Sequence, residues 1–380
     1  MPKLTKKQEW PVRFCHVIDS CTPNPLLFNS IKFSDREKFD YQVIALGPEA
    51  GLQAQMSEIG VPVRSLNYTS RKQALSVFIK LFSIFRRERI GVVQTHLMDA
   101  SLIGLSAARV ARVALSIFTG HHSHEIPLYK RKWLTFMDGS NGRFFAKHTI
   151  APTASMKEIF VRDLKIAEKK VSVLHHGFDL KDWRDKASQT SDFRKEFGFE
   201  DKIVFGAVGR LFWVKNFENL IRGFATVVKN EPNIILAIVG AGDRSKLEQL
   251  VASLGLHDKV FFTGPRSDMA AVMKSFDILV HPSLAESFGM IYIEALALGK
   301  PVLSTKVGIA TDVIENGKNG YLVNGSDASS IAQGLAKMLD AKENWEEWGQ
   351  RGIIRAEDFD IRKTQPICDA MYAKWLIENQ

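Results

Sequence analysis

Two carboxylates, Glu286 and Glu294, lie in a segment whose pattern suits ligand binding. An apolar run at 276–280 leads into a loop of small and polar residues, and Gly289 then opens an apolar, helix-like segment. This order predicts a strand, a loop that carries Glu286, and a helix that carries Glu294 near its start. The first N–H groups of such a helix, at 288–291, have no partner within it and, with the helix dipole, they suit a phosphate.

Two cations follow another predicted strand. This strand ends at Gly209, and Arg210 and Lys215 come just before a helix-like stretch. A guanidinium can bind pyrophosphate oxygens in pairs and an ammonium acts as a compact charge, so the pair suits a diphosphate; two ordinary surface cations are the simpler alternative. The Gly240-Ala-Gly242 turn completes neither a dinucleotide-binding fingerprint nor a Walker motif.

A diphosphate site with two carboxylates narrows the choice of ligand. One carboxylate can accept hydrogen bonds from ribose hydroxyls and the other from a sugar, so a nucleotide sugar suits the whole set. A retaining glycoside hydrolase also uses two carboxylates, about 5 Å apart, but needs no phosphate-binding groups. We therefore favour an enzyme that uses a nucleotide sugar.

The elements that would position these groups alternate along the chain. Short β-rich runs are separated by helix-like or polar stretches, which predicts an α/β fold with two Rossmann-like, doubly wound parallel-sheet domains. The expected strands are 12–18, 41–46, 61–66, 92–95, 115–119, 149–152 and 171–174 in the first half, and 203–208, 234–239, 260–262, 278–281, 301–304 and 320–323 in the second.

The length of 380 residues predicts two domains, at 1–180 and 181–363, joined by a polar linker around 178–192. A final helix within 364–380 can pack back on the first domain. The apolar residues on one side of this helix are Ile367, Met371 and Leu376. A second helix, at 71–89, is basic, and its apolar positions are Leu75, Phe78, Ile79, Phe82 and Phe85.

Composition indicates a soluble or peripheral protein of a reducing compartment. Cys15, Cys21 and Cys368 are few and widely spaced, which favours neither a disulfide framework nor a zinc cluster. No apolar run approaches the roughly 18 residues that span a bilayer, and the N-terminus lacks the apolar core of a signal peptide. We expect a cytoplasmic protein.

Positive charge is concentrated in the N-terminal half. Residues 1–180 hold 26 Lys and Arg against 15 Asp and Glu, or +11, which leaves 51 − 26 = 25 against 42 − 15 = 27, or −2, for the rest. The 71–89 helix and the Tyr129–Trp133 segment could place the protein on the anionic inner face of a membrane. The interpretation we favour is a helix that covers the sheet with its charges solvated. No reading motif for nucleic acid accompanies the charge.

Three stretches of the second half carry a combined signature. They are Gly209-Arg-Leu-x-x-x-Lys-Asn216, His281-Pro-Ser followed by Glu286 and Glu294, and 315–323. They resemble the diphosphate-binding segment, the E-x7-E signature and the following loop and strand of retaining GT-B glycosyltransferases of family 4, also called glycosyl transferases group 1. The likeness runs along most of the chain. It implies two domains facing across a cleft, with 1–180 on the acceptor side and 181–363 binding the nucleotide sugar.

The resemblance also implies roles. Glu294 would bind ribose hydroxyls, and Glu286 would contact the donor sugar near its anomeric face. Arg210 and Lys215 would stabilise charge on the leaving diphosphate. His121, in Thr119-x-His121, would reach the donor sugar from the first domain. The implied catalytic residues are Glu286, His121, Arg210 and Lys215, and the donor-binding residues are Gly209, Arg210, Lys215, Glu286, Phe288, Gly289, Met290, Ile291 and Glu294.

Other positions match this pattern less well. His122 and His124 are less securely matched than His121, and we expect His96 to be structural. His176 replaces an Asn of the family's turn before the linker. The loop after the first strand, 19–25, lacks the paired glycines that family members commonly have there, so acceptor placement stays open.

We expect no cofactor and no metal. Asp358-Phe-Asp360 has the spacing of a metal motif, but it follows a charged helical stretch and we interpret it as solvated. The cations Arg210 and Lys215 make a divalent ion unnecessary for the diphosphate.

The leading hypothesis is a metal-independent hexosyltransferase. It would move a sugar from a nucleoside-diphosphate sugar, by default a UDP-sugar, to a hydroxyl acceptor such as a glycan, a lipid-linked saccharide or a small molecule, with retained configuration. The alternatives are a nucleotide-sugar epimerase or a phosphorylase of the same architecture, and a non-catalytic module that binds nucleotide sugars.

Overall fold

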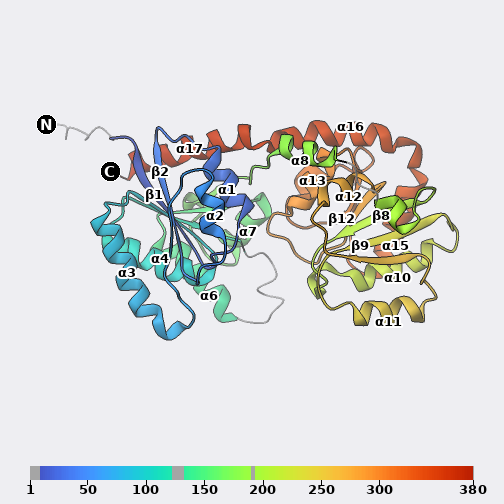
Figure 1. Ribbon diagram of the computed structural model, residues 1–380, viewed down its shortest axis with the longest axis horizontal. Helices are drawn as coiled ribbons and strands as arrows, with labels where there is room; N and C mark the ends of the chain where they lie inside the picture. The colour runs from blue at the N-terminus through green and yellow to red at the C-terminus, as the bar shows by residue number, and fades with distance from the viewer. Residues whose placement is uncertain (1–8, 122–131, 190–192, 380) are drawn as a thin grey trace. The chain divides into compact units, whose positions relative to one another are not determined.

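The computed structural model describes residues 9–121, 132–189 and 193–379, which form two α/β units, each built on one parallel sheet (Figure 1). Unit 1 comprises Met1–Phe178 and Ile361–Gln380, and unit 2 comprises Asp179–Asp360. The chain therefore enters unit 2 after Phe178 and returns to unit 1 after Asp360.

The sheet of unit 1 has seven parallel strands in the order β3-β2-β1-β4-β5-β6-β7. Its central strands are almost wholly buried, which explains their near-continuous apolar sequences. The strand order reverses between β1 and β4. The expected strands of this half are confirmed, with the bounds β1 Val12–Ile18, β2 Phe39–Ala45, β3 Val63–Ser65, β4 Val92–His96, β5 Leu115–Thr119, β6 His148–Ala151 and β7 Val171–Val173.

Polar side chains cap the N-termini of helices in unit 1. Asn24 accepts a hydrogen bond from the Leu27 N–H at the start of α1, and Thr153 accepts one from the Met156 N–H at the start of α7. The helices are α1 Pro25–Lys32, α2 Leu52–Ser57, α3 Ala74–Arg87, α4 Met98–Ala111, α6 Lys132–Ser140, α7 Ala154–Arg162 and α17 Ile361–Glu378, with the short turns η1 Arg71–Gln73, η2 Asn141–Phe145 and η3 Glu168–Lys170.

The basic helix forms as expected, but only some of the apolar positions noted in the sequence, Phe85 among them, lie on its buried face. Val77, Leu81, Ile84 and Phe85 of α3 are buried. Leu75 and Ile79, by contrast, are 71% and 56% exposed. Apolar residues occur on more than one side of this helix, and only packing against α4 and the sheet selects the side that is buried.

The last helix, α17, belongs to unit 1. Ser30 Oγ donates to Gln365 Oε1 at 2.9 Å, and Asp369 accepts from Ser34 Oγ at 2.9 Å. The buried apolar side of α17 includes Tyr372, Trp375 and Leu376, which join the core of the sheet. Leu376 thus faces the core as the sequence suggested, whereas Ile367 is 58% exposed and the helix face inferred from it is wrong.

The sheet of unit 2 has six parallel strands in the order β10-β9-β8-β11-β12-β13. The order reverses between β8 and β11, so unit 2 repeats the doubly wound plan of unit 1. All six expected strands are confirmed, with the bounds β8 Ile203–Val208, β9 Ile234–Val239, β10 Val260–Gly264, β11 Ile278–His281, β12 Val302–Thr305 and β13 Gly320–Val323.

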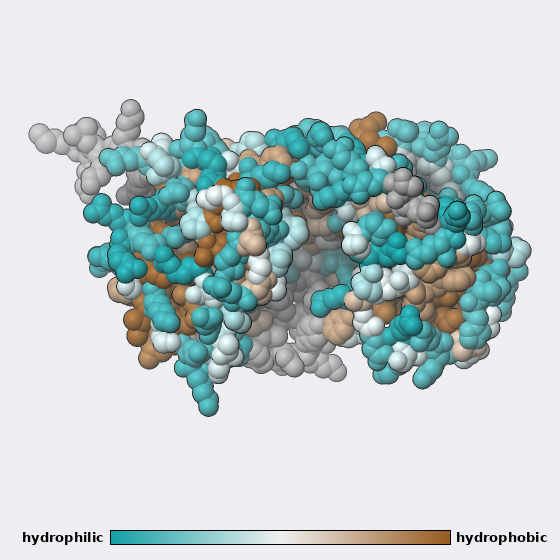
Figure 2. All heavy atoms as spheres, viewed as in Figure 1, coloured by the Kyte–Doolittle hydropathy of each residue, from teal (hydrophilic) through white to brown (hydrophobic). Residues whose placement is uncertain are grey.

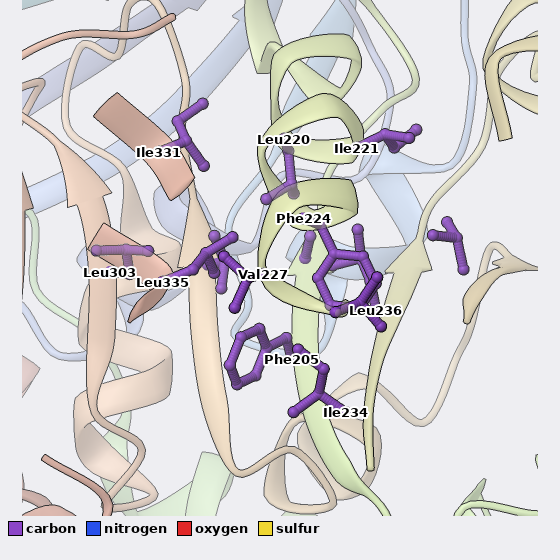
Figure 3. Close-up of a cluster of buried hydrophobic side chains, with 14 of the residues drawn as sticks. Phe205, Leu220, Ile221, Phe224, Val227, Ile234, Leu236, Leu303, Ile331 and Leu335 are labelled. Carbon is purple, nitrogen blue, oxygen red and sulfur yellow. The ribbon is translucent and has the colours of Figure 1, made fainter. Parts of the chain in front are cut away.

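Unit 2 has its own hydrophobic core (Figure 3). Phe205 of β8 packs with Phe224 of α10, and Leu335 of α15 joins the same buried cluster. Burying each such side chain is worth about 1.5–3 kcal/mol. The helices are α8 Leu180–Ala187, α9 Phe193–Phe197, α10 Phe217–Val227, α11 Ser245–Ser253, α12 Met269–Lys274, α13 Met290–Ala297, α14 Ala310–Val313, α15 Ala328–Asp340 and α16 Trp345–Ala356, with the short turns η4 Trp213–Lys215, η5 Lys342–Asn344 and η6 Glu357–Phe359.

The linker expected at 178–192 is largely a helix. Asp179 accepts a hydrogen bond from the Asp182 N–H and starts α8, whose Leu180 and Ala187 are buried. The polar composition that suggested a linker belongs to the solvent side of this helix. Across the residues that the structure describes, no helix is both long and apolar enough to cross a membrane.

Candidate active site

The donor-binding residues expected in unit 2 gather at the carboxyl ends of its central strands. The loop 209–216 follows β8 and the loop 282–289 follows β11. These two strands are neighbours at the point where the strand order reverses. In doubly wound sheets the loops on either side of such a point diverge and leave a crevice, where ligands bind.

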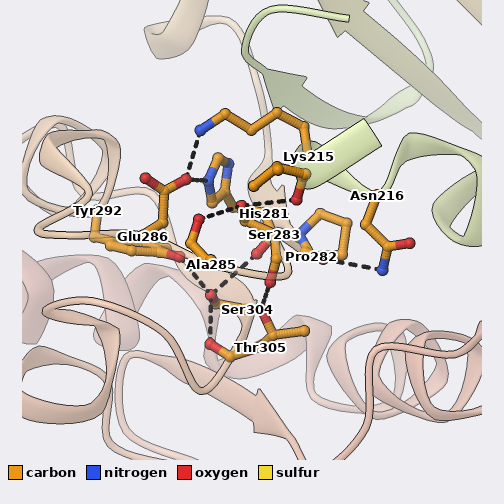
Figure 4. Close-up of polar contacts among 11 residues, drawn as sticks. Lys215, Asn216, His281, Pro282, Ser283, Ala285, Glu286, Tyr292, Ser304 and Thr305 are labelled. Atoms are coloured by element: carbon orange, nitrogen blue, oxygen red, sulfur yellow. Dashed lines mark hydrogen bonds and ion pairs between the residues drawn. The ribbon is translucent and has the colours of Figure 1, made fainter. Parts of the chain in front are cut away.

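An ion pair and a hydrogen bond meet on one oxygen of Glu286 (Figure 4). Lys215 Nζ pairs with Glu286 Oε1, and His281 Nε2 is 2.8 Å from the same oxygen. Burial lowers the pKa of His281, so the ring is neutral at pH 7 and donates to the carboxylate from Nε2. Burial opposes ionisation of Glu286 too, but the His281 hydrogen bond and the Lys215 charge outweigh it and lower the pKa of Glu286 to about 2. Glu286 is therefore an anion at neutral pH.

Hydrogen bonds tie the two loops together. Ser283 Oγ donates to Val214 O at 3.1 Å, and the Leu284 N–H donates to the same carbonyl at 2.7 Å. Asn216 Nδ2 donates to Pro282 O at 3.1 Å (Figure 4). Since these bonds join residues next to Lys215 with residues two to four positions before Glu286, they hold the ion pair at a defined place.

Two buried residues, Ser304 and Tyr292, hold His281 in place. Ser304 Oγ lies 3.0 Å from His281 O and 2.9 Å from the Tyr292 hydroxyl. The Tyr292 ring packs edge-on against the imidazole, with ring centres 5.3 Å apart. His281, Tyr292 and Ser304 are all buried, so the imidazole has little freedom to leave Glu286.

Lys215 and Arg210 differ in their surroundings. The aliphatic stem of Lys215 lies against Gly209, where an added Cβ would be 3.3 Å from three of its carbons. Arg210 is exposed, and its guanidinium forms no hydrogen bond or ion pair with the residues that the structure describes. Of the two expected cations, one is therefore already paired. The Gly240 turn packs so closely that a Cβ there would lie 1.9 Å from Gly209 O.

The helix α13 begins directly after Gly289, as expected. Gly289 has φ +86°, and a Cβ on it would lie 2.5 Å from the Tyr292 ring, so both conformation and space require glycine. The N–H groups of Met290 and Ile291 belong to the first helical turn, which has no acceptor within the helix. The helix follows directly after the loop that carries Glu286.

A glycine that the sequence analysis did not single out supports this loop. Gly308, after β12, has φ +55°, and a Cβ on it would lie 2.3 Å from Phe288 O and 2.9 Å from Glu286 Cβ. The next N–H, of Ile309, donates to Phe288 O at 2.7 Å. The only sequence signal was a glycine shortly after a strand, which does not say what it contacts.

Glu294 differs from Glu286 in character. It is half-buried on α13, and burial raises the pKa of its carboxyl to about 7. Within the described ranges its carboxylate has no hydrogen-bond or ion-pair partner. A carboxyl with spare acceptor capacity suits hydroxyl groups of a ligand.

In unit 1, His121 follows β5 and lines a cavity of about 300 Å³. His96, at the end of β4, places Nδ1 3.0 Å from His121 Nε2. His16, on β1, places Nδ1 3.0 Å from His96 Nε2. All three imidazoles line the cavity. From the sequence, His121 was expected to reach the donor sugar and His96 to be structural, and His16 was not singled out.

The loop after β1 caps the start of a helix of unit 1. The Asp19 carboxylate accepts hydrogen bonds from the N–H groups of Met98 and Ala100, and so caps α4. This end of α4 is therefore occupied by a carboxylate of the chain. The residues that the structure shows lining the cavity include no Asp, Glu, Lys or Arg.

Comparison with protein families decides the assignment. Residues 188–355 match the family described as Glycosyl transferases group 1, and residues 31–182 match the family described as Glycosyltransferase Family 4. The first match lies in unit 2, and the second lies in unit 1 except for its last four residues. The chain belongs to glycosyltransferase family 4. With its two doubly wound units, this glycosyltransferase has the GT-B fold.

Individual relatives cover almost the whole glycosyltransferase. The capsular polysaccharide biosynthesis glycosyltransferase CapM of Staphylococcus aureus is 25% identical over 375 residues, which are 96% of this chain and 98% of that protein. The UDP-Gal:alpha-D-GlcNAc-diphosphoundecaprenol alpha-1,3-galactosyltransferase of Escherichia coli is 26% identical over 317 residues, which are 80% of this chain and 81% of that protein. The structure of Anabaena Alr3699/HepE in complex with UDP-glucose has a TM-score of 0.81 at 21% identity, covering 95% of this chain and 99% of that chain.

Other residues of this glycosyltransferase that were considered from the sequence lie outside the two sites. His122, His124 and 129–131 are outside the described residues. Asp358 is exposed and pairs with Arg355, but Asp360 is only 9% exposed, so the solvated interpretation is wrong for Asp360. Among the residues described, no three His, Cys, Asp or Glu side chains are grouped in a way that could hold a metal ion.

Proposed function

We propose that this glycosyltransferase moves a hexosyl group from a nucleoside-diphosphate sugar to a hydroxyl acceptor, with retained anomeric configuration. The observation that carries the proposal is the cluster of Lys215, Glu286 and His281 beside the exposed Arg210 and the first turn of α13. The cluster combines cations and N–H groups, which attract a diphosphate, with the Glu286 carboxylate, which is an anion in the same loops.

We take a UDP-sugar as the donor. Alr3699/HepE was solved with UDP-glucose, and the Escherichia coli relative is named for UDP-Gal. Arg210 and the N–H groups of Met290 and Ile291 would bind the diphosphate, and Glu294 would accept hydrogen bonds from ribose hydroxyls. A diphosphate would compete with Glu286 for Lys215. Donor binding would therefore loosen the ion pair and free the Glu286 carboxylate for the sugar.

The charge states of these groups favour electrostatic catalysis. The low pKa of Glu286 makes it a poor general acid at neutral pH, but its negative charge can stabilise positive charge on the sugar as the bond to the diphosphate breaks. Lys215 and Arg210 would stabilise the negative charge on the leaving diphosphate. Because the chain supplies these cations, the proposed reaction is independent of a divalent metal.

Unit 1 would bind the acceptor. Its cavity offers neutral hydrogen-bonding groups, and burial lowers the pKa of His16 to about 3 and that of His176 to about 4, so both rings are uncharged at neutral pH. Gln94 also lines the cavity, and its carbonyl oxygen is buried and has no hydrogen-bonding partner in the described chain. Such a lining favours an uncharged, hydroxyl-bearing part of an acceptor over a phosphate or carboxylate.

The test is a screen of nucleotide sugars against the purified full chain. Thermal stabilisation identifies the donor, since a ligand at about 100 times its Kd adds about 2.7 kcal/mol. The released products then classify the reaction. Free nucleoside diphosphate with a glycosylated acceptor whose anomeric configuration matches the donor supports the proposal. An altered but intact nucleotide sugar indicates an epimerase, sugar phosphate formed with inorganic phosphate indicates a phosphorylase, and binding without turnover indicates a non-catalytic module.

A second proposal concerns the membrane surface. On α3, Leu75 and Ile79 are exposed between Lys72 and Lys80, and Figure 2 shows hydrophobic residues interrupting the hydrophilic surface there. This pattern suits a cytoplasmic protein that binds peripherally to anionic lipid. Flotation with vesicles containing phosphatidylserine should recover the parent at low salt and lose Lys72→Glu/Lys80→Glu. Equal recovery of both proteins would contradict the proposal.

A further inference from the structure

The chain of three imidazoles in unit 1 has a geometry that packing alone does not require. β1, β4 and β5 are adjacent parallel strands, and His16, His96 and His121 come from their carboxyl ends. Consecutive ring centres are 5.3 Å apart, and each ring nitrogen that faces a neighbouring imidazole is 3.0 Å from it. The hydrogen bonds lead from His16, inside β1, through His96 to His121, two residues after β5.

The backbone beside the middle ring is strained. Leu97, which follows His96, has φ +69° and ψ −173°, a conformation that belongs to glycine. Such a residue costs on the order of 1–3 kcal/mol. The turn at Leu97 lies between His96 and the start of α4, whose Met98 N–H donates to the Asp19 carboxylate.

The two inner rings, of His16 and His96, are neutral. Burial lowers the pKa of His16 to about 3 and lowers the pKa of His96 well below its ordinary value, with the neighbouring His121 a smaller cause. A neutral imidazole has one donor nitrogen and one acceptor nitrogen. Each contact in the chain must therefore pair a donor with an acceptor.

The order of the nitrogens links the three tautomers. Nδ1 of His16 faces Nε2 of His96, and Nδ1 of His96 faces Nε2 of His121. If His16 donates from Nδ1, then His96 and His121 must also carry their protons on Nδ1. If His121 donates from Nε2, then all three carry their protons on Nε2. A mixture would place two protons or none between one pair of nitrogens.

We infer that His16 and His96 are positioning residues that set the tautomer of His121. The inference rests on the proposed function in one respect, which is that the cavity lined by His121 binds a hydroxyl-bearing part of the acceptor. In one state of the chain Nδ1 of His121 is a hydrogen-bond donor and in the other it is an acceptor, so the imidazole deep in β1 decides which hydroxyl geometry His121 can bind. Changing between the two tautomers places no charge in the cavity.

The simpler alternative is that His16 is only a buried ring. It stacks on Phe14 with ring centres 4.8 Å apart and on Tyr41 with ring centres 5.6 Å apart. Phenylalanine would keep this stacking and remove the hydrogen bond. His16→Phe therefore separates the two roles, and the exposed His257 offers a control, His257→Phe.

Nitrogen NMR of the full chain, with ¹⁵N in its histidine rings, reads the tautomers directly, because protonated and bare ring nitrogens resonate far apart. We expect His16, His96 and His121 to share one tautomer in the parent. In His16→Phe the two His121 nitrogens should move toward intermediate frequencies, and in His257→Phe they should stay unchanged. Different tautomers among the three rings of the parent would overturn the inference without any variant, as would an unchanged His121 in a folded His16→Phe.

Kinetics give a second readout once the donor is known. His16→Phe should lower kcat about tenfold, and the donor KM should stay within about twofold, because the tautomer acts on orientation rather than on diphosphate binding. His16→Asn, whose amide can still donate to His96 Nε2, should recover part of this loss. Equal kcat in parent and His16→Phe would contradict the inference.

The two proposals fail in different ways. If the parent transfers sugar but its three imidazoles have independent tautomers, only the positioning role is wrong. If the tautomers are linked but no nucleotide sugar is bound or used, the histidine chain stands and the proposed function falls.

Discussion

The two units of this glycosyltransferase share a plan and differ in their chemistry. Each has a doubly wound parallel sheet, and in each the polar residues gather where the strand order reverses, at β1 and β4 in unit 1 and at β8 and β11 in unit 2. In unit 2 these residues are charged, with Lys215 paired to Glu286. In unit 1 the described cavity lining has no Asp, Glu, Lys or Arg.

This difference shows that net charge and site charge are separate properties. The N-terminal half carries the protein's positive excess, +11 by sequence, and yet the cavity described in that half is neutral. The second half is slightly negative and contains the cation cluster. Lys and Arg on a surface cost little free energy of folding, whereas a charge in a cavity needs a partner. The charged groups in a site therefore indicate the charge of its ligand better than the net charge of that half of the chain does.

The largest effect should come from removing the cation of unit 2. Lys215→Met keeps the apolar stem against Gly209 and deletes the ammonium, so kcat should fall about 10²–10³-fold, and the melting temperature should fall as well because Glu286 loses its ion-pair partner. The exposed Lys229 provides the matched control, Lys229→Met, which should retain parental kcat. Stopped assays of nucleoside diphosphate release measure both. A parental rate in Lys215→Met would remove the charged cluster from the mechanism.

Gly308 tests whether the loop of Glu286 depends on close packing. In Gly308→Ala, a Cβ would lie 2.3 Å from Phe288 O and the residue would have φ +55°, so unfolding in urea should show a loss of roughly 3 kcal/mol and lower activity. Gly198 also has positive φ, but nothing lies within 4 Å of its Cβ position. Gly198→Ala should therefore cost only about 1 kcal/mol. Equal losses in the two variants would show that strain alone matters.

The two glutamates should shape the pH dependence of stability in opposite ways. Glu294 has a folded pKa raised to about 7, so its contribution is full below its unfolded value near 4.5 and is lost as pH rises through 7, on the order of 2 kcal/mol. Glu286 has a folded pKa lowered to about 2, so its contribution is present above about 4.5 and is lost as pH falls toward 2. Denaturant unfolding between pH 4.5 and 8 measures the first effect, and Glu294→Gln should flatten it. A profile unchanged by Glu294→Gln would show that its carboxyl is not desolvated.

The smallest expected effect is a difference in salt dependence between the donor KM, which depends on unit 2, and the acceptor KM, which depends on unit 1. Raising ionic strength to about 0.5 M screens exposed charges, so the donor KM should rise a few-fold through Arg210. The acceptor KM should stay within about twofold, because the described cavity of unit 1 offers neutral groups. Steady-state kinetics at two salt concentrations test this. A matching rise in the acceptor KM would show that charges outside the described cavity lining bind the acceptor.

Much of the fold could be predicted because its signals are local. All thirteen strands of the described chain were expected from short apolar runs, and α13 begins after Gly289 as the glycine and the apolar period indicated. Helix faces were predicted less well. Ile79 and Ile367 are exposed because these helices carry apolar residues on several sides and the sheet decides which side is buried. The α8 helix was taken as a linker because its surface is polar.

The sequence by itself determined the class of the site. The types and spacing of Arg210, Lys215, Glu286 and Glu294 indicate a diphosphate flanked by hydroxyls, since each group carries its chemistry with it. Only the tertiary structure decided how these groups are paired. Lys215 meets Glu286 across 71 residues and His16 meets His96 across 80, because parallel strands bring distant loops to one edge of a sheet. Opposite pKa shifts in two similar glutamates, and a histidine chain in a cavity lined by neutral groups, follow from that pairing.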